Sequence, residues 1–434
     1  MGCGLTLTLY TLLLRLLLPL ALLRLLWRSL RAPAYRRRIG ERLALESSAP
    51  GPADVWVHAV SVGEVQAAAP VIRHLLGRDQ PLRVLVTTTT PTGAARAAEL
   101  FGDSVVHRYT PFDLPQRVGR FLDRVRPRLA LVMETEIWPN TLAEANRRGI
   151  PVILANARLS ERSARGYRRL QPLIGETLRR FDRIAAQGEA DARRFLDLGA
   201  EPARVQVTGS IKFDQRLPAS LQEQSEVMRR AWGTRPVWVA ASTHEGEDEP
   251  VLSAHRVVRE SVPNALLVLV PRHPERFAQV AALVAREGFT LERRSDRAPC
   301  GEETAVYLGD TMGELPVFLA AADAAFIGGS LVPTGGHNLL EAAAAGVPAA
   351  TGPHVFNFTA IVDLLVAADA AVVVSDPAEL ASLMARWLTD AAERARIGEN
   401  GRRVVEQNRG ALNRLIDLIE ARLAAPGDPE SGPI

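Results

Sequence analysis

The stretch Phe326–Glu341, FIGGSLVPTGGHNLLE, decides how we interpret the rest of the 434-residue chain. It starts at the end of a predicted buried strand, which Gly328 and Gly329 interrupt, and a helix is expected to open at His337. A strand that ends in glycines before a helix N-terminus favours an anion, because free backbone N–H groups face the ligand and glycine lets it approach. Glu341 could then accept hydrogen bonds from a ribose diol. The alternative is an ordinary strand-to-helix turn, in which glycine serves only the turn.

Short apolar runs alternate with helix-like segments along most of the chain. The predicted strands are Val55–Val60, Val84–Thr88, Leu129–Met133, Val152–Leu154, Ile184–Ala186 and Val205–Thr208, then Val237–Ala241, Leu266–Val270, Thr304–Leu308, Ala324–Ile327, Val347–Ala350 and Val372–Val374. This alternation is typical of an α/β fold with parallel, doubly wound sheets, in which ligands lie at the carboxyl ends of the strands. We therefore expect two tandem Rossmann-like domains with a cleft between them.

The length of the chain also predicts two domains, because a single core rarely grows this large. A polar, proline-containing segment near Arg216–Glu226 separates the two series of strands. We expect an anchor and basic flank over residues 1–35, a first domain over 36–220, a second over 221–425 and a disordered tail over 426–434. The last predicted helix, Ala411–Leu423, could cross back onto the first domain.

The N-terminal segment is basic and rich in leucine. The run Leu5–Leu26 is close to the length that crosses a bilayer. Residues 1–50 hold eight arginines and two glutamates, a net charge of +6, whereas the whole chain has +3. Arginines that follow an apolar run stay cytoplasmic and meet anionic lipid. Arg15 and Arg24 lie on roughly opposite helical faces, which argues against an amphipathic stripe. We expect a membrane anchor helix, spanning or embedded; the alternative is a buried helix of a soluble protein.

Composition and motifs exclude several classes of protein. The modest positive charge is confined to the N-terminus, so we expect no nucleic-acid partner. Cys3 and Cys300 form neither a disulfide framework nor a zinc motif, which suits a reducing compartment. The chain has no G-x-G-x-x-G after a strand and no G-x-x-x-x-G-K-[ST], so nicotinamide oxidoreductases and P-loop ATPases are disfavoured. We expect no metal and no cofactor.

Polar loops follow the strands of the first half. Glu64 comes directly after the first strand, where a carboxylate could remove a proton from an acceptor hydroxyl; the alternative is a glutamate that favours the helix dipole. Glu134 and Glu136 follow a later strand as a functional pair or as caps of the next helix. Arg158 and Lys212 end two further strands and could hold a phosphate or carboxylate, or lie on the surface.

The second half repeats this arrangement. The loops STHEGE (242–247), PRHPERF (271–277) and GDTMGEL (309–315) each follow a strand. Arg272 and His273 supply cationic or hydrogen-bonding groups in the same domain as the glycine-rich stretch. Such a number of polar loops at the carboxyl ends of strands favours a ligand site over packing.

Eight stretches together resemble one family. They are SVGEV (61–65), METEIWPN (133–140), NARLSERS (156–163), GSIKFD (209–214), STHEGE, PRHPERF, GDTMGEL and GGSLVPTGGHNLLEAAAAGVP (328–348). In this order they are similar to the lipid A 3-deoxy-D-manno-octulosonic acid (Kdo) transferases of Gram-negative bacteria, which are inverting glycosyltransferases of the GT-B class. The likeness runs from the N-terminus to about residue 360, and eight motifs in order are far more specific than one.

The resemblance implies a reaction and its residues. The donor would be CMP-Kdo, the acceptor the tetraacyldisaccharide 1,4′-bisphosphate precursor of lipid A (lipid IVA), and the location the cytoplasmic side of the inner membrane. Glu64 matches the family's general base, and Glu134 and Lys212 match positions that stabilise the transition state. The positions that match CMP-binding residues are Arg272, His273, Met312, Gly313, Glu314, Asn338, Leu339, Leu340 and Glu341. The supporting positions are Gly335, Gly336, His337, Arg158 and Ser210.

Two other functions remain open at this point. Another GT-B enzyme, such as a UDP-sugar transferase or a sugar epimerase, would share the two domains but would not need SVGEV and METEIWPN together. A membrane-tethered, non-catalytic binding protein would keep the anchor but would tolerate the loss of Glu64. The sequence does not decide how many Kdo residues are added or the oligomeric state.

Overall fold

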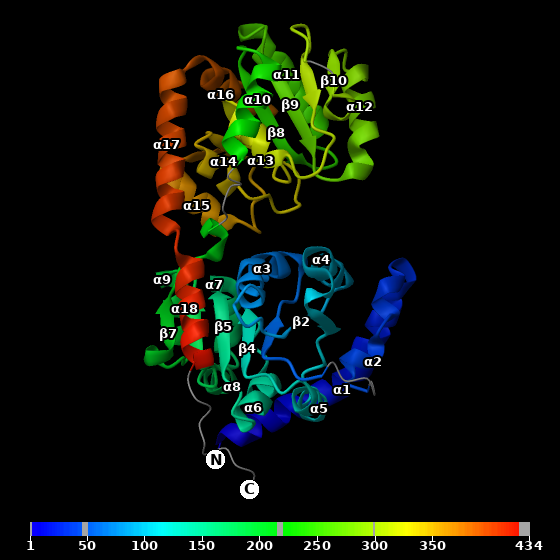
Figure 1. The fold of residues 1–434 in the computed structure, drawn as a ribbon, viewed down its shortest axis with the longest axis vertical. Helices are drawn as coiled ribbons and strands as arrows, with labels where there is room; N and C mark the ends of the chain where they lie inside the picture. Colours follow the sequence, from blue (N-terminus) through cyan, green and yellow to red (C-terminus); the bar gives the residue numbers. More distant parts are fainter. Residues whose placement is uncertain (1, 46–50, 215–219, 298–299, 425–434) are drawn as a thin grey trace. The chain divides into compact units, whose positions relative to one another are not determined.

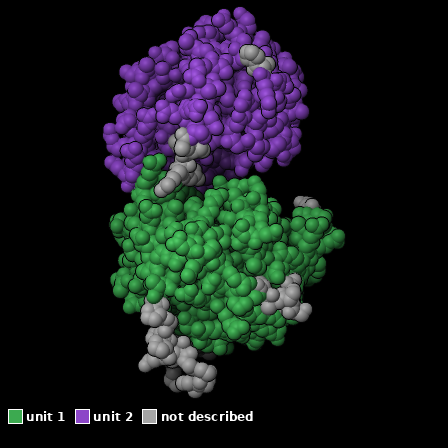
Figure 2. Space-filling view, in the orientation of Figure 1, with its two compact units in different colours: residues 1–214, 409–434 green, residues 215–408 purple. Residues whose placement is uncertain are grey.

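The chain folds into two compact units, each with its own parallel sheet (Figures 1 and 2). The computed structural model describes residues 2–45, 51–214, 220–297 and 300–424. Unit 1 comprises residues 1–214 and 409–434, and unit 2 comprises residues 215–408. The C-terminal helix of the chain thus belongs to unit 1.

Unit 1 holds a seven-stranded parallel sheet in the order β3-β2-β1-β4-β5-β6-β7. Its strands are β1 (Val55–His58), β2 (Val84–Thr88), β3 (Val106–Tyr109), β4 (Leu129–Met133), β5 (Val152–Ala157), β6 (Arg183–Ala186) and β7 (Val205–Val207). Apolar side chains fill both faces of the sheet, because helices cover both sides. The order reverses beside β1, where ligands bind in doubly wound sheets.

The helical elements of unit 1 connect these strands. They are α1 (Gly2–Arg31), η1 (Pro33–Arg36), α2 (Ile39–Arg42), α3 (Val62–Leu76), α4 (Pro91–Phe101), η2 (Gly102–Ser104), α5 (Pro115–Val125), α6 (Pro139–Arg147), α7 (Glu161–Arg168), α8 (Gln171–Leu178), α9 (Glu189–Asp197), η3 (Pro202–Arg204), η4 (Ile211–Asp214) and α18 (Ala411–Ala424). The carboxylate of Asp214 accepts from the N–H groups of Gly410 and Leu412, at 2.6 and 2.7 Å, and so caps α18.

Unit 2 repeats the architecture, with strand order β10-β11-β9-β8-β12-β13-β14. The strands are β8 (Val237–Thr243), β9 (Leu266–Pro271), β10 (Leu291–Arg293), β11 (Val306–Leu308), β12 (Ala324–Ile327), β13 (Ala349–Thr351) and β14 (Ala371–Val373). The helical elements are α10 (Leu221–Trp232), α11 (Asp248–Ser261), η5 (Pro274–Arg276), α12 (Phe277–Arg286), η6 (Arg294–Asp296), α13 (Leu315–Ala321), α14 (Leu340–Ala345), α15 (Thr359–Ala367), α16 (Pro377–Thr389) and α17 (Ala391–Asn408).

The predicted α/β class and both parallel sheets are confirmed. Two strands were not predicted: β3, whose sequence VHRY is half polar, and β10, whose sequence is LER. Both lie at the edge of a sheet, where one neighbour is missing and the apolar signal is weak.

Helix α1 is long and apolar enough to cross a membrane over Thr6–Leu30, by length and composition. It also contacts the rest of unit 1. The Tyr10 hydroxyl donates to Asp113 Oδ2 at 2.9 Å, and Thr11 Oγ1 donates to Asn140 Oδ1 at 3.0 Å. The helix packs against α6 and α8, and runs past them in Figure 1.

The segment after α1 is tied to the sheet as well. Arg38 Nη2 donates to the carbonyl of His107 at 2.7 Å, and the N–H of Tyr109 donates to Glu41 Oε2 at 2.7 Å. Contacts with unit 1 therefore occur near the start of α1 and just after its end. Elsewhere along α1, large apolar side chains are exposed: Leu9, Leu12, Leu13, Leu16, Leu17, Leu20, Leu23, Leu26, Trp27 and Leu30.

A buried carboxylate holds the glycine-rich loop of unit 2. Glu247 is fully buried, and its Oε2 accepts from the N–H groups of His244 at 2.8 Å and Gly329 at 2.6 Å. Its Oε1 accepts from Ser330 and Leu331, both at 2.9 Å. Four charge-assisted hydrogen bonds thus join the loop after β8 to the loop after β12.

We expect Glu247→Gln to destabilise unit 2. The side-chain amide cannot accept from two of the four N–H groups, and each buried donor left without a partner costs roughly 1–3 kcal/mol. The free energy of unfolding, measured by chemical denaturation, should fall by at least about 2 kcal/mol. Glu245→Gln is the matched control, because Glu245 is exposed in the same loop. Equal stability of the two variants would contradict this role.

Candidate active site

The carboxyl ends of neighbouring parallel strands bring four predicted residues to one edge of the unit 1 sheet. Glu64 follows β1, Glu134 follows β4, Arg158 follows β5 and Lys212 lies in η4 after β7. Glu134 Oε2 lies 3.4 Å from Arg158 Nε, and Glu134 Oε1 lies 3.8 Å from Lys212 Nζ. Glu64 interacts electrostatically with Lys212 and Glu134. The structure therefore groups all four side chains in one charged cluster.

Glu64 takes part in the cap at the start of its own helix, whose N-cap residue is Ser61. Its Oε2 accepts from the N–H of Val60 at 2.8 Å, and its Oε1 accepts from the hydroxyl of Ser61 at 3.2 Å. Ser61 in turn accepts from the N–H of Glu64, which completes a reciprocal cap at the start of α3. The structural role that the sequence allowed for Glu64, at the start of its helix, is thus observed. The carboxyl group is nevertheless half-buried beside the charged cluster.

Burial raises the pKa of Glu64 to about 7, and the nearby charges of Glu136 and Glu134 add to this shift. The hydrogen bonds from Val60 and Ser61 oppose it, because they favour the ionised form. A carboxyl group with a pKa near neutrality can take a proton and release it again under physiological conditions.

Glu134 and Lys212 influence each other across the cluster. Burial lowers the pKa of Lys212, and the charge of Glu134 opposes that shift. Glu134 has a φ of 56°, in the left-handed region that a residue other than glycine rarely adopts. Such a conformation has an energetic cost, and it is often found where a side chain is positioned for function.

Three further polar residues lie at the same strand ends of unit 1; Glu136 and Ser210 were predicted as candidates, whereas Asn156 was noted only within its motif. Glu136 accepts from Trp138 Nε1 at 2.7 Å, and burial raises its pKa, with Glu134 adding to the shift. The fully buried Asn156 accepts from the N–H of Ile211 at 3.2 Å and so fixes the segment that carries Lys212. Ser210, a predicted supporting residue, is buried, and its Oγ has no hydrogen-bond partner among the described residues.

In unit 2, the loops after β8, β9 and β12 bring together a cation and three imidazoles. His244 Nε2 lies 2.9 Å from His337 Nε2, and the His273 ring meets the His244 ring edge-on, with 5.2 Å between centroids. Arg272 interacts electrostatically with His337 and with Glu341. Burial raises the pKa of Glu341, and Arg272 opposes the shift. This group of charges suits an anionic ligand.

The prediction that a helix begins at His337 was wrong. Helix α14 begins at Leu340 and has six residues, and just before it Asn338 Oδ1 accepts from the N–H of Leu340 at 3.1 Å in a local turn. Leu339 and Leu340 are buried in the core, so only their backbones could meet a ligand. His337 therefore lies in the loop before the helix.

Two predicted glycines of this loop are required by its shape. Gly335 has a φ of 106°, and a Cβ there would lie 2.2 Å from the side-chain nitrogen of Asn357. Gly336 has a φ of 76° and passes close to the backbone of Val355. Both conformations favour glycine.

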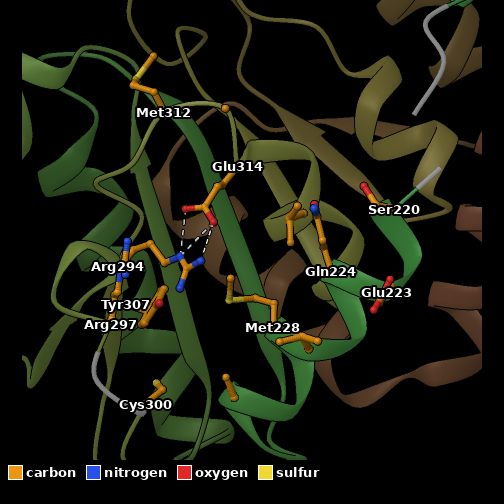
Figure 3. Close-up of a pocket in the computed structure, with 14 residues that line it drawn as sticks. Ser220, Glu223, Gln224, Met228, Arg294, Arg297, Cys300, Tyr307, Met312 and Glu314 are labelled. Carbon is orange, nitrogen blue, oxygen red and sulfur yellow. Dashed lines mark hydrogen bonds and ion pairs between the residues drawn. The ribbon is translucent and has the colours of Figure 1, made fainter. Parts of the chain in front are cut away.

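Met312, Gly313 and Glu314 lie around a separate cavity of about 880 Å³ (Figure 3). Arg294 Nη2 donates to Glu314 Oε1 at 2.7 Å and Arg294 Nε donates to Oε2 at 3.0 Å, and Thr311 also donates to this carboxylate. These contacts lower the pKa of Glu314, with the hydrogen bond from Arg294 as the largest cause. The residues that line the cavity do not include Arg272, His273 or His337. Within this cavity, Arg294 and Thr311 occupy the Glu314 carboxylate.

Sequence reasoning missed His244 as a site residue, although its loop was noticed. The signal was the motif STHEGE directly after a strand, which places the first polar side chains at the ligand edge of the sheet. Among the described residues, no group of three or more His, Cys, Asp or Glu side chains is placed to hold a metal ion.

Comparison with known proteins agrees with these two halves. Residues 37–215 match the family model described as 3-deoxy-D-manno-octulosonic-acid transferase (kdotransferase), and residues 235–404 match glycosyl transferases group 1. The chain is 43% identical to 3-deoxy-D-manno-octulosonic acid transferase of Haemophilus influenzae, covering 95% of this chain and 98% of the relative. It is 40% identical to the enzyme of that name from Bordetella pertussis, again covering 95% and 98%.

The fold has solved relatives. UDP-GlcNAc 2-epimerase from Neisseria meningitidis, bound to UDP-GlcNAc, is 16% identical with a TM-score of 0.57, covering 85% of this chain and 99% of the epimerase. This likeness concerns the GT-B-like fold alone. The extent and identity of the match to the transferases are decisive, and the chain belongs to the 3-deoxy-D-manno-octulosonic acid (Kdo) transferase family of glycosyltransferases.

Proposed function

We propose that this protein transfers Kdo from CMP-Kdo to the lipid A precursor, with inversion at the anomeric carbon, during lipopolysaccharide synthesis. The observation that carries the proposal is the Glu64 carboxyl group, whose raised pKa of about 7 suits a general base. It lies in a cluster with Glu134 and Lys212, and the chemistry of the transfer requires both a base and charged groups.

The chemistry follows from the charges that the transfer creates. As the bond between the anomeric carbon and the CMP phosphate breaks, the carbon becomes oxocarbenium-like and its electron pair passes to the phosphate. An acceptor hydroxyl attacks the opposite face, and Glu64 takes its proton, so that one displacement inverts the configuration. Glu134 would stabilise the developing positive charge, whereas Lys212 and Arg158 would hold the carboxylate of Kdo.

The cationic group of unit 2 would hold the donor nucleotide. Arg272 and the imidazoles face the same site and would bind the phosphate, while the buried carboxyl of Glu341 would accept from the ribose hydroxyls. A leaving group with a single phosphate needs less charge neutralisation than a diphosphate. The Met312–Glu314 stretch would contact CMP through its backbone, because Arg294 already engages the Glu314 carboxylate.

We also propose that α1 holds the enzyme on the cytoplasmic face of the inner membrane. Because Tyr10 and Thr11 contact unit 1 near one end and Arg38 contacts it after the other, the docked helix would lie along the bilayer surface with its exposed leucines among the acyl chains. The arginines that follow would meet anionic headgroups. This location would bring the active site to an acceptor that carries acyl chains.

We expect Glu64→Gln to lower the rate of transfer by roughly 10²- to 10⁴-fold, the range typical of general base catalysis. The measurement is mass spectrometry of the lipid A precursor after incubation with CMP-Kdo, which also counts the Kdo residues added. Glu189→Gln is the matched control, since Glu189 is an exposed glutamate at the start of α9.

Three outcomes of this experiment are informative. No mass increase with the wild-type protein, combined with binding of UDP in preference to CMP, would reject the Kdo reaction and favour a UDP-sugar enzyme. Full activity of Glu64→Gln would keep the reaction and remove Glu64 as its base. Activity that falls equally in Glu189→Gln would indicate a general defect.

We expect kcat/KM to rise with pH through a midpoint near 7. Below this pH the Glu64 carboxyl is protonated and cannot accept a proton, so activity is lost as pH falls through its raised pKa. Glu136→Gln should move the midpoint to lower pH, because it removes a negative charge that disfavours ionisation of Glu64. Glu99→Gln, at an exposed position of α4, should leave it unchanged. If the midpoint of Glu136→Gln equals that of the wild-type protein, the electrostatic coupling between Glu136 and Glu64 is contradicted.

We expect the triple variant Leu13→Gln, Leu16→Gln, Leu20→Gln to bind membranes more weakly than the wild-type protein. These side chains are exposed on α1, and burial of a leucine contributes about 1.5 kcal/mol or more, so partition into vesicles should fall roughly a thousandfold. Flotation with vesicles that contain anionic lipid measures the effect. Val227→Gln, which changes an exposed valine of unit 2, is the control. Unchanged flotation of the triple variant would remove α1 as the anchor.

A further inference from the structure

His244 and His337 form a hydrogen-bonded imidazole pair. Their Nε2 atoms are 2.9 Å apart, and their rings are nearly parallel, with 17° between the planes and 5.1 Å between centroids. A hydrogen bond between two ring nitrogens needs one proton between them, so one Nε2 donates and the other accepts. The donating ring then has a bare Nδ1, which can take a second proton.

The chain is shaped around this pair. A Cβ on Gly329, whose φ is 68°, would lie 2.9 Å from Cδ2 and 3.0 Å from Nε2 of His337, so only glycine leaves room for the ring. The buried Glu247 accepts from the backbone N–H of His244 and from that of Gly329. One carboxylate therefore fixes both loops that bring the two imidazoles together.

Cationic groups surround the pair. The charged and titratable groups that face it are Arg272 and His273 from the loop after β9, Arg276 from η5, and Glu247 from the loop after β8. Arg276 is itself bound to Asp248, and Glu247 is occupied by four N–H groups. Burial lowers the pKa of His337 to about 4, with His244 and Arg272 adding to the shift, and burial also lowers the pKa of His244. These shifts favour the neutral form of the unliganded pair.

We propose that the His244–His337 pair takes up one proton from solvent when the phosphate of the donor nucleotide binds, and holds that phosphate as a cationic pair. The proton adds to the free Nδ1 of the donating ring, and the Nε2–H···Nε2 hydrogen bond is kept. An adjacent anion favours the charged imidazole, and this attraction opposes the burial and the cations that keep the free pair neutral. This inference rests on the proposed function, because it takes CMP as the nucleotide.

As a consequence, the charge of the His244–His337 pair depends on whether the nucleotide is bound. Without nucleotide, the site avoids a further positive charge beside Arg272 and Arg276. With nucleotide, the imidazolium supplies a charge-assisted hydrogen bond to the phosphate, which gains negative charge when the glycosidic bond breaks. The ring that takes the proton contacts the phosphate, and the other ring positions it through the hydrogen bond between the two Nε2 atoms.

Isothermal titration calorimetry in buffers of different ionisation enthalpy tests the proposal. At pH 7.5 the phosphate of free CMP is mostly dianionic, since its second pKa is about 6. We attribute a proton taken up on binding to a group of the protein. We expect close to one proton taken up per CMP bound, and none with cytidine, which lacks the phosphate. His337→Asn and His244→Asn should abolish the uptake and weaken CMP binding roughly 10- to 100-fold, with the affinity for cytidine unchanged. His74→Gln, a surface histidine of unit 1, should behave as wild type.

Each other result counts against the proposal. The proposed protonation of the His244–His337 pair is overturned if the wild-type protein binds CMP without proton uptake. It is also overturned if proton uptake persists in both histidine variants. Either result leaves the proposed donor intact. Cytidine affinity serves as the check of folding, and His337→Gln as a second variant if His337→Asn fails it. Failure of a folded wild-type protein to bind CMP at all rejects the donor itself and the inference with it.

Discussion

Parallel strand pairing is the constraint on which both halves of this molecule depend. Every strand pair in the two sheets is parallel, so each connection must return to the opposite edge, and all carboxyl ends of a sheet meet at one side. Residues as distant in sequence as Glu64, Glu134 and Lys212 become neighbours through this geometry alone. The same rule gathers His244, Arg272 and His337 in unit 2.

The sequence predicts those features that depend on regular alternation, and it fails where a single contact decides. Apolar runs located the central strands and the loops that follow them, and the motifs picked out Glu64, Arg272 and His337. The runs missed β3 and β10, because edge strands carry little apolar signal. They placed a helix start at His337, since they cannot show that the Asn338 side chain forms a local turn with the N–H of Leu340 before the helix begins.

Buried polar contacts between distant loops lie further beyond sequence reasoning. Nothing in the motif STHEGE shows that Glu247 would receive four N–H groups from two loops 82 and more residues apart, or that His244 would meet His337. Asn156 is similar, because its hydrogen bond to Ile211 joins segments 55 residues apart. Such contacts are local in space and distant in sequence, and no spacing pattern encodes them.

Under the proposed function, Glu64 would combine a structural role and a chemical role in one side chain. Burial and the charges of Glu136 and Glu134 drive its pKa upward, whereas the N–H of Val60 and the hydroxyl of Ser61 pull it down. The hydrogen bonds of the cap therefore keep the pKa of the carboxyl group lower than burial and the neighbouring charges alone would set it. Without the burial, it would be a weak base that holds a proton poorly. The hydrogen bonds of the helix cap thus help to set the pKa of the carboxyl group, and the capping interpretation is compatible with the proposed catalytic one.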